Sequence, residues 1–171
     1  MKKKNIIIFI LISFLLGLPF ILVNNKNKKN QQNKEVYQSI PLFQIHDING
    51  NIITEALLRD YKTVMFIYFN PDCDLCVDEI KQIKENESSF TRGKIIFFSD
   101  LPADEIQQFL QKIDFIPTQN ILFLSDEKKI LINKMEVKSS PTVYIYRDNQ
   151  LIKRFDGVVK IETLIQYFTE D

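Results

Sequence analysis

Residues 64–87 read VMFIYFNPDCDLCVDEIKQIKENE, and this stretch decides the fold of the chain. Its first six residues, 64–69, are continuously apolar and rich in β-branched and aromatic side chains, which predicts a strand buried on both faces. Asn-Pro-Asp at 70–72 ends this strand, because proline cannot extend a central strand. Apolar residues then recur at helical spacing from Cys76 to Ile83, with polar residues between them. The stretch therefore predicts a strand, a tight turn and an amphipathic helix.

Two cysteines, Cys73 and Cys76, lie where this helix begins. The free amides and the positive dipole of a helix N-terminus stabilise a thiolate, so Cys73 is expected to be a nucleophile. Cys76 is one turn further on, on the same face, and close enough to bond to Cys73. We predict that Cys73 attacks the disulfide of a partner and that Cys76 resolves the mixed disulfide, which leaves a redox-active Cys73–Cys76 disulfide.

Other interpretations of the cysteine pair are a structural disulfide, two unrelated core residues, or half of a zinc site. Zinc takes four ligands in a closed site, and the chain offers only Cys73, Cys76 and His46, so no metal is expected within one chain. His46 precedes a turn at the end of a predicted strand, and we expect it to be an ordinary surface residue. Redox chemistry is favoured, because this CxxC lies between a strand and a helix.

Two further motifs accompany the pair: Glu79 completes a CxxCxxE pattern, and Ser140-Pro141-Thr142 precedes another apolar strand. Together these features resemble the thioredoxin superfamily, most closely its membrane-anchored TlpA/ResA-like branch of thiol-disulfide oxidoreductases, which have a redoxin or AhpC/TSA-like domain. The resemblance covers about residues 40–168. It implies a thioredoxin-like three-layer α/β sandwich with a central mixed sheet, preceded by one N-terminal transmembrane helix.

The resemblance also implies roles for individual residues. Glu79 is expected to handle protons for the cysteine pair. The Ser140–Pro141 bond is expected to be cis and to face the CxxC, with Ser140, Pro141 and Thr142 binding the substrate backbone. Pro117-Thr118 is a second Pro-Thr pair, but only Pro141 is followed by the closing hairpin and helix of the family, so Pro117 is expected in a loop. No cofactor is implied beyond the redox-active cysteines.

The sequence departs from the family pattern at three places. Asp72 replaces the usual tryptophan before the first cysteine, and the chain contains no tryptophan. Asp74-Leu75 replaces the usual Gly-Pro or Glu-Pro between the cysteines, and Ile67 stands where classical thioredoxins bury a carboxylate. These departures leave the reaction type unchanged and concern the partner and the redox potential.

The region 37–171 has the length of one domain, and it alternates strands and helices in the manner of an α/β fold. The patterns predict strands at 40–45, 94–99, 121–126, 142–147 and 151–155, helices at 104–113, 127–135 and 160–168, and turns at 47–51 and 148–149.

The N-terminal region, 1–23, contains eighteen uncharged residues at 6–23, enough to cross a bilayer as a helix. A cleaved signal peptide is the alternative, but the small residues that cleavage needs are missing, so we predict an uncleaved signal anchor. Residues 24–36 are expected to be a flexible polar tether. Six of the 22 basic residues and none of the 22 acidic residues precede Gln31, so the rest of the chain carries −6. Such an acidic domain is a poor candidate for nucleic-acid binding.

Four acidic residues crowd the cysteines: Asp72, Asp74, Asp78 and Glu79. Negative neighbours oppose thiolate formation, which favours the disulfide over the dithiol and indicates a reductant. Alternatively, these are solvated acids with little effect.

We therefore predict an extracytoplasmic, membrane-anchored thiol-disulfide oxidoreductase that reduces disulfide-bearing envelope proteins and is recharged by an upstream thiol reductant. A peroxiredoxin-like thiol peroxidase is one alternative, although Asn70 stands where it would need Thr or Ser. A non-catalytic peptide-binding module, engaging peptides through the Pro141 groove, is another. A copper chaperone of the Sco type is disfavoured, because the cysteine spacing is wrong and no histidine follows His46.

Overall fold

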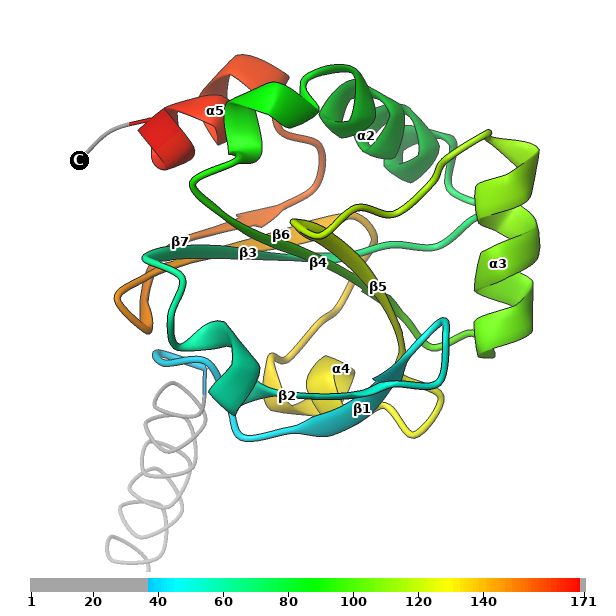
Figure 1. Cartoon of the computed structure of the whole chain (residues 1–171), viewed down its shortest axis with the longest axis horizontal. Coiled ribbons are helices and arrows are strands. Elements are labelled where there is room, and N and C mark those ends of the chain that lie inside the picture. The colour runs from blue at the N-terminus through cyan, green and yellow to red at the C-terminus, as the bar shows by residue number, and fades with distance from the viewer. Residues whose placement is uncertain (1–36, 170–171) are drawn as a thin grey trace, which may run out of the picture. The chain divides into compact units, whose positions relative to one another are not determined.

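The computed structural model describes residues 37–169, which build a seven-stranded sheet with helices on both faces (Figure 1). The predicted transmembrane helix at 6–23 and the tether at 24–36 lie outside the described residues. Among residues 37–169, no helix has the length and apolar character needed to cross a membrane.

The sheet has the strand order β2-β1-β5-β4-β3-β6-β7. Its three central strands, β3, β4 and β5, are parallel, whereas β6 and β1 pair antiparallel with them, so the sheet is mixed as predicted. The strands are β1 (Gln44–Asp47), β2 (Ile52–Thr54), β3 (Thr63–Tyr68), β4 (Gly93–Ser99), β5 (Ile121–Ser125), β6 (Thr142–Arg147) and β7 (Gln150–Asp156). The helices are η1 (Glu55–Leu58), α2 (Asp74–Glu85), η2 (Glu87–Phe90), α3 (Ala103–Lys112), α4 (Ile130–Lys134) and α5 (Ile161–Thr169).

The strand predicted at 64–69 is β3, which pairs with β4 on one side and β6 on the other. All of its residues except Tyr68 are buried, and β4 is buried throughout. A strand covered on both faces takes apolar residues without alternation, which explains why the sequence pattern identified it. The carboxyl end of β3 leads directly into the turn that carries Cys73 and then into α2.

Apolar side chains form one cluster on each face of the sheet. Under α2, α3 and α5, Phe97 and Phe123 stack with their ring centroids 4.7 Å apart. On the opposite face, under η1 and α4, the Phe66 ring meets Phe98 and Tyr146 edge-on. The three predicted layers are therefore present, with α2 held over the end of β3 by its buried Ile80 and Ile83 (Figure 1).

Two predicted elements have different bounds. The strand predicted at 40–45 begins only at Gln44, because the amides of Ile40 and Phe43 donate to the side chains of Asn149 and Glu55 instead of to a strand. The helix predicted at 127–135 is shortened to α4. The patterns also failed to predict β2, η1 and η2, which are three or four residues long and too short to show periodicity.

The turn that follows β1 has the predicted form. Gly50 adopts φ +84°, a conformation that glycine accepts without steric cost. The carboxylate of Asp47 accepts hydrogen bonds from the amides of Asn49 and Asn51, both at 2.8 Å.

Candidate active site

Cys73 is the N-cap residue of α2. A turn places it there: the amide of Asp72 donates to Asn70 Oδ1 and the amide of Cys73 donates to the Asn70 carbonyl, at 2.9 and 3.0 Å. The thiol sulfur accepts the amide of Cys76 at 3.3 Å, so it occupies the position of a capping oxygen. Cys73 is also partly exposed. The sulfur is thus accessible and held by the end of a helix, as the sequence predicted.

The predicted proline loop lies against Cys73. The Ser140–Pro141 peptide bond is cis, and Cys73 Sγ lies 3.8 Å from the carbonyl oxygen of Ser140. Thr142 begins β6 opposite Tyr68, and its hydroxyl donates to the Ser139 carbonyl at 2.6 Å. The structure therefore brings the Ser140 carbonyl, which precedes the cis bond to Pro141, to Cys73, although the two segments are far apart in sequence.

Pro117, the second Pro-Thr proline, lies in the segment between α3 and β5. Within residues 37–169, the only cis peptide bond is the one that precedes Pro141. The prediction that Pro117 is a loop proline is confirmed.

Cys76 has a different environment from Cys73. Its side chain is buried and packs into the cluster beneath α2, α3 and α5, while its sulfur is a free thiol. Burial is the main cause that raises the pKa of the Cys76 thiol to about 12; the neighbouring Cys73 sulfur acts in the same direction, and hydrogen bonds with Asn70 and Ser140 oppose it. A solvent molecule or a bulky partner therefore meets Cys73 first, and Cys76 lies behind it.

Glu79 follows Cys76 by three residues along α2 and is also buried, at 2% exposure. Burial raises the pKa of its carboxyl to about 7, partly opposed by the amide of Val159, which donates to Oε1 at 3.4 Å. The other oxygen, Oε2, is buried and has no hydrogen-bond partner among residues 37–169. Nothing in the sequence marked Val159 as a neighbour of this site. A carboxyl group that is half protonated near neutral pH can take up or release a proton beside the cysteines.

The four acidic residues near the cysteines separate into two kinds. Asp72, Asp74 and Asp78 are exposed, and only Glu79 is buried. The main cause that opposes ionisation of Cys76 is burial and not the aspartates, in agreement with the alternative that these acids are solvated. The sequence nevertheless missed the cations that share their surface, which belong to α2 and α3 and are described below.

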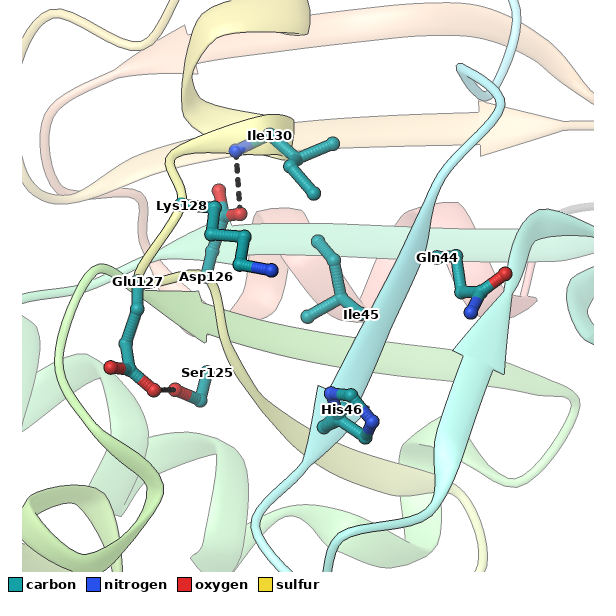
Figure 2. Close-up of a pocket in the computed structure, with 8 residues that line it drawn as sticks. All are labelled: Gln44, Ile45, His46, Ser125, Asp126, Glu127, Lys128 and Ile130. Atoms are coloured by element: carbon teal, nitrogen blue, oxygen red, sulfur yellow. Dashed lines mark hydrogen bonds between the residues drawn. The ribbon is translucent and has the colours of Figure 1, made fainter.

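His46 lies on β1, is exposed, and lines a hollow with residues from the β5–α4 connection (Figure 2). In this hollow the Asp126 carboxylate binds the amide of Ile130 at 2.6 Å, and Ser125 donates to Glu127 (Figure 2). Within residues 37–169 no three His, Cys, Asp or Glu side chains gather in a way that could hold a metal ion. The expectation that His46 is a surface residue is confirmed.

Comparisons with known proteins agree with this fold. A sequence model described as the AhpC/TSA family matches residues 36–161. Three solved structures from Mycobacterium tuberculosis are similar. The structure of dsbF has 18% sequence identity, covers 78% of this chain and 95% of its own, and has a TM-score of 0.64. A secreted disulfide oxidoreductase homologous to DsbE of E. coli has 16% identity, covers 78% of this chain and 96% of its own, and has a TM-score of 0.62; the peroxidoxin BcpB has 14% identity, covers 76% of this chain and 93% of its own, and has a TM-score of 0.65. No curated protein matches the sequence significantly.

Proposed function

The chain belongs to the AhpC/TSA family, and from this membership and the arrangement of Cys73 and Cys76 we propose that it is a thiol-disulfide oxidoreductase acting on proteins. The observation that carries the proposal is the position of Cys73 Sγ. It caps α2 at 3.3 Å from the Cys76 amide and lies 3.8 Å from the Ser140 carbonyl. An attacking sulfur and a backbone edge that an extended chain can bind are therefore adjacent.

In the proposed reaction, the Cys73 thiolate attacks one sulfur of the partner's disulfide. The partner's S–S bond breaks, a mixed disulfide forms, and the partner's other sulfur leaves as a thiolate that takes up a proton. Cys76 then loses its proton and attacks Cys73 Sγ, which releases the partner's second thiolate. In sum, the partner gains two electrons and two protons, and the protein is left with a Cys73–Cys76 disulfide.

The second step requires a base, because the pKa of the Cys76 thiol is raised to about 12. Glu79 is suited to be this base, since burial raises its pKa to about 7 and its Oε2 has no hydrogen-bond partner in the described part of the chain. We assign Glu79 as the group that accepts the Cys76 proton, directly or through one water, and releases it when the protein is recharged. No cofactor is needed beyond the two sulfurs.

The proposed direction is reduction of the partner. A dithiol whose buried member resists ionisation gains little from thiolate formation, and this favours the disulfide form of the protein. An upstream thiol reductant must then return two electrons to Cys73–Cys76. The uncharged run at 6–23 supports a membrane anchor. Protein disulfides persist mainly outside the cytoplasm, so a domain that reduces them is expected on the extracytoplasmic side.

The test uses the full chain in neutral detergent, with reduction of insulin disulfides followed by turbidity. We expect Cys73→Ser to abolish turnover and Cys76→Ser to accumulate a mixed disulfide that gel electrophoresis without reductant detects. Undiminished turnover by Cys73→Ser would exclude the proposal. Rapid consumption of hydrogen peroxide with no insulin reduction would assign the chain to the peroxidase alternative.

A further inference from the structure

A hollow of about 650 Å³ lies between α2 and α3, and residues on both sides of the attacking cysteine line one end of it. Pro71, Asp72 and Asp74, which flank Cys73, form one part of its lining, and residues of α3 form another. The hollow shares no lining residue with the segment 140–142. The Ser140 carbonyl lies at Cys73 Sγ, and Asp72 and Asp74 on either side of Cys73 line the hollow, so a partner chain held at Cys73 can reach both surfaces.

Charged groups are distributed unevenly along this hollow. At the cysteine end, Asp72 and Asp74 are exposed, and their carboxylates form no ion pair within residues 37–169. Lys81 and Lys112 also line the hollow, and their ammonium groups are likewise exposed and unpaired in the described part of the chain.

The two lysines lie at the same end of the hollow. Lys84 of α2 forms an ion pair with Asp114, just after α3, at 3.7 Å. The carboxyl end of α3 therefore lies beside the distal half of α2, so Lys81, one turn before Lys84, and Lys112, two residues before Asp114, line the same end of the hollow. The same ion pair compensates Asp114, so the distal end is positive and the cysteine end is negative.

The floor between the two ends is apolar. Phe109 is buried at 7% exposure and Val77 and Ile113 are partly buried, and all three line the hollow. Asp74 and Lys81 are seven residues apart on one helix, which corresponds to about 10 Å at 1.5 Å per residue. An extended chain covers this length in about three residues at 3.3 Å each.

We propose that this hollow is the specificity subsite for the protein partner of the proposed oxidoreductase, and that it binds an extended segment of defined charge order. That segment carries a basic side chain beside the reacting cysteine, an apolar side chain next to it, and acidic side chains about three residues from the cysteine. The basic group faces Asp72 and Asp74, the apolar group covers Val77 and Phe109, and the acidic groups face Lys81 and Lys112. The inference rests on the proposed function, because only a partner held at Cys73 would extend into the hollow.

The experiment measures how fast the reduced full chain, in neutral detergent, is oxidised by symmetric disulfide dimers of short peptides. The matched peptide has the sequence Cys-Arg-Leu-Glu-Glu, and the reversed peptide has Cys-Glu-Leu-Arg-Arg. Each is also made with its cysteine at the other end, so that the direction of binding does not matter. The rate constant of each peptide is divided by that of bis(2-hydroxyethyl) disulfide, a small neutral disulfide, with the same protein.

We expect the matched peptide, in its better orientation, to react about tenfold faster than the reversed peptide at low ionic strength. The ratio of the matched to the reversed rate constant should fall toward one in 1 M salt, where the screening length is about 3 Å. The double variant Lys81→Glu/Lys112→Glu should invert the preference. Lys128→Glu, an exposed lysine of the hollow in Figure 2, is the control and should retain it.

Equal rates for matched and reversed peptides, or a preference that survives the double variant, would overturn the subsite. If the chain reduces bis(2-hydroxyethyl) disulfide but does not discriminate between peptides, the subsite fails and the oxidoreductase stands. If it reduces neither the peptides nor the small disulfide, the proposed function fails and the subsite fails with it.

Discussion

Two carboxyl groups, those of Glu79 and Asp126, are almost completely buried, at 2% and 1% exposure, and burial raises the pKa of both. Their hydrogen bonds differ. Asp126 accepts the amide of Ile130 at 2.6 Å and that of Ile132 at 2.9 Å, each on a different oxygen. Within the residues that the structure describes, Glu79 accepts only the Val159 amide, at 3.4 Å, and its Oε2 has no hydrogen-bond partner.

The comparison separates a structural carboxylate from a reactive one. Both oxygens of Asp126 are used to begin α4, where Lys129 adopts a left-handed conformation with φ +54°. Glu79 has an unused oxygen and lies one turn from Cys76. Because an unsatisfied buried polar group costs stability, its presence beside a redox pair indicates a functional role.

The largest expected effect is on stability, through Asp126. Asp126→Ala removes the acceptors of two amides and should lower the free energy of unfolding by on the order of 3 kcal/mol. Asp126→Asn keeps one acceptor oxygen, and about half of this loss is expected. Denaturant unfolding measures both variants, and the disulfide reductase rate of folded protein should not change. A loss of rate in folded Asp126→Ala, measured at a temperature well below its transition, would remove the distinction between the two carboxyl groups.

The next effect is on rate, through Glu79. Glu79→Gln retains the shape of the side chain but cannot take the Cys76 proton, so release of the partner from the mixed disulfide should slow by on the order of a hundredfold. The first step, attack by Cys73, should be unaffected, and quenched-flow trapping of the mixed disulfide distinguishes the two steps. Glu85→Gln, at an exposed position of the same helix, is the matched control. Equal release rates in all three proteins would show that Glu79 has no part in proton transfer.

The difference between these carboxyl groups could be predicted only in part from the sequence. The spacing of Cys73, Cys76 and Glu79 on one helix face is a local property, and α2 confirmed it. The role of Asp126 depends on the backbone conformation after β5, and the contact of Glu79 with Val159 joins residues separated by 80 positions. A pattern of apolar residues carries no signal for either.

The same reasoning explains which elements were predicted. β3 and β4 are buried on both faces, and their apolar runs identified them directly. The start of β1 was predicted too early, because the amides of Ile40 and Phe43 donate to the side chains of Asn149 and Glu55. These contacts are tertiary and leave no local sequence pattern. The cations of the α2–α3 hollow were missed for a related reason, since Lys112 approaches α2 only in the folded chain.

The smallest effect in this series is the pH dependence of stability that Glu79 contributes. Its folded pKa of about 7 lies above the ordinary value of 4.5, so the unfolded state ionises first and the folded state loses stability as the pH rises from 4.5 through 7. Between pH 5 and 7 this loss should be about 2 kcal/mol. Asp126 titrates in the same direction, so the informative quantity is the difference between the unfolding free energies of the wild type and Glu79→Gln. The unfolding free energy of Glu79→Gln should rise relative to that of the wild type across this pH range, and the difference should stay constant above it. A difference that is flat from pH 5 to 7 would mean that Glu79 titrates in the folded protein as it does in water, and the base assigned to Cys76 would have to be another group.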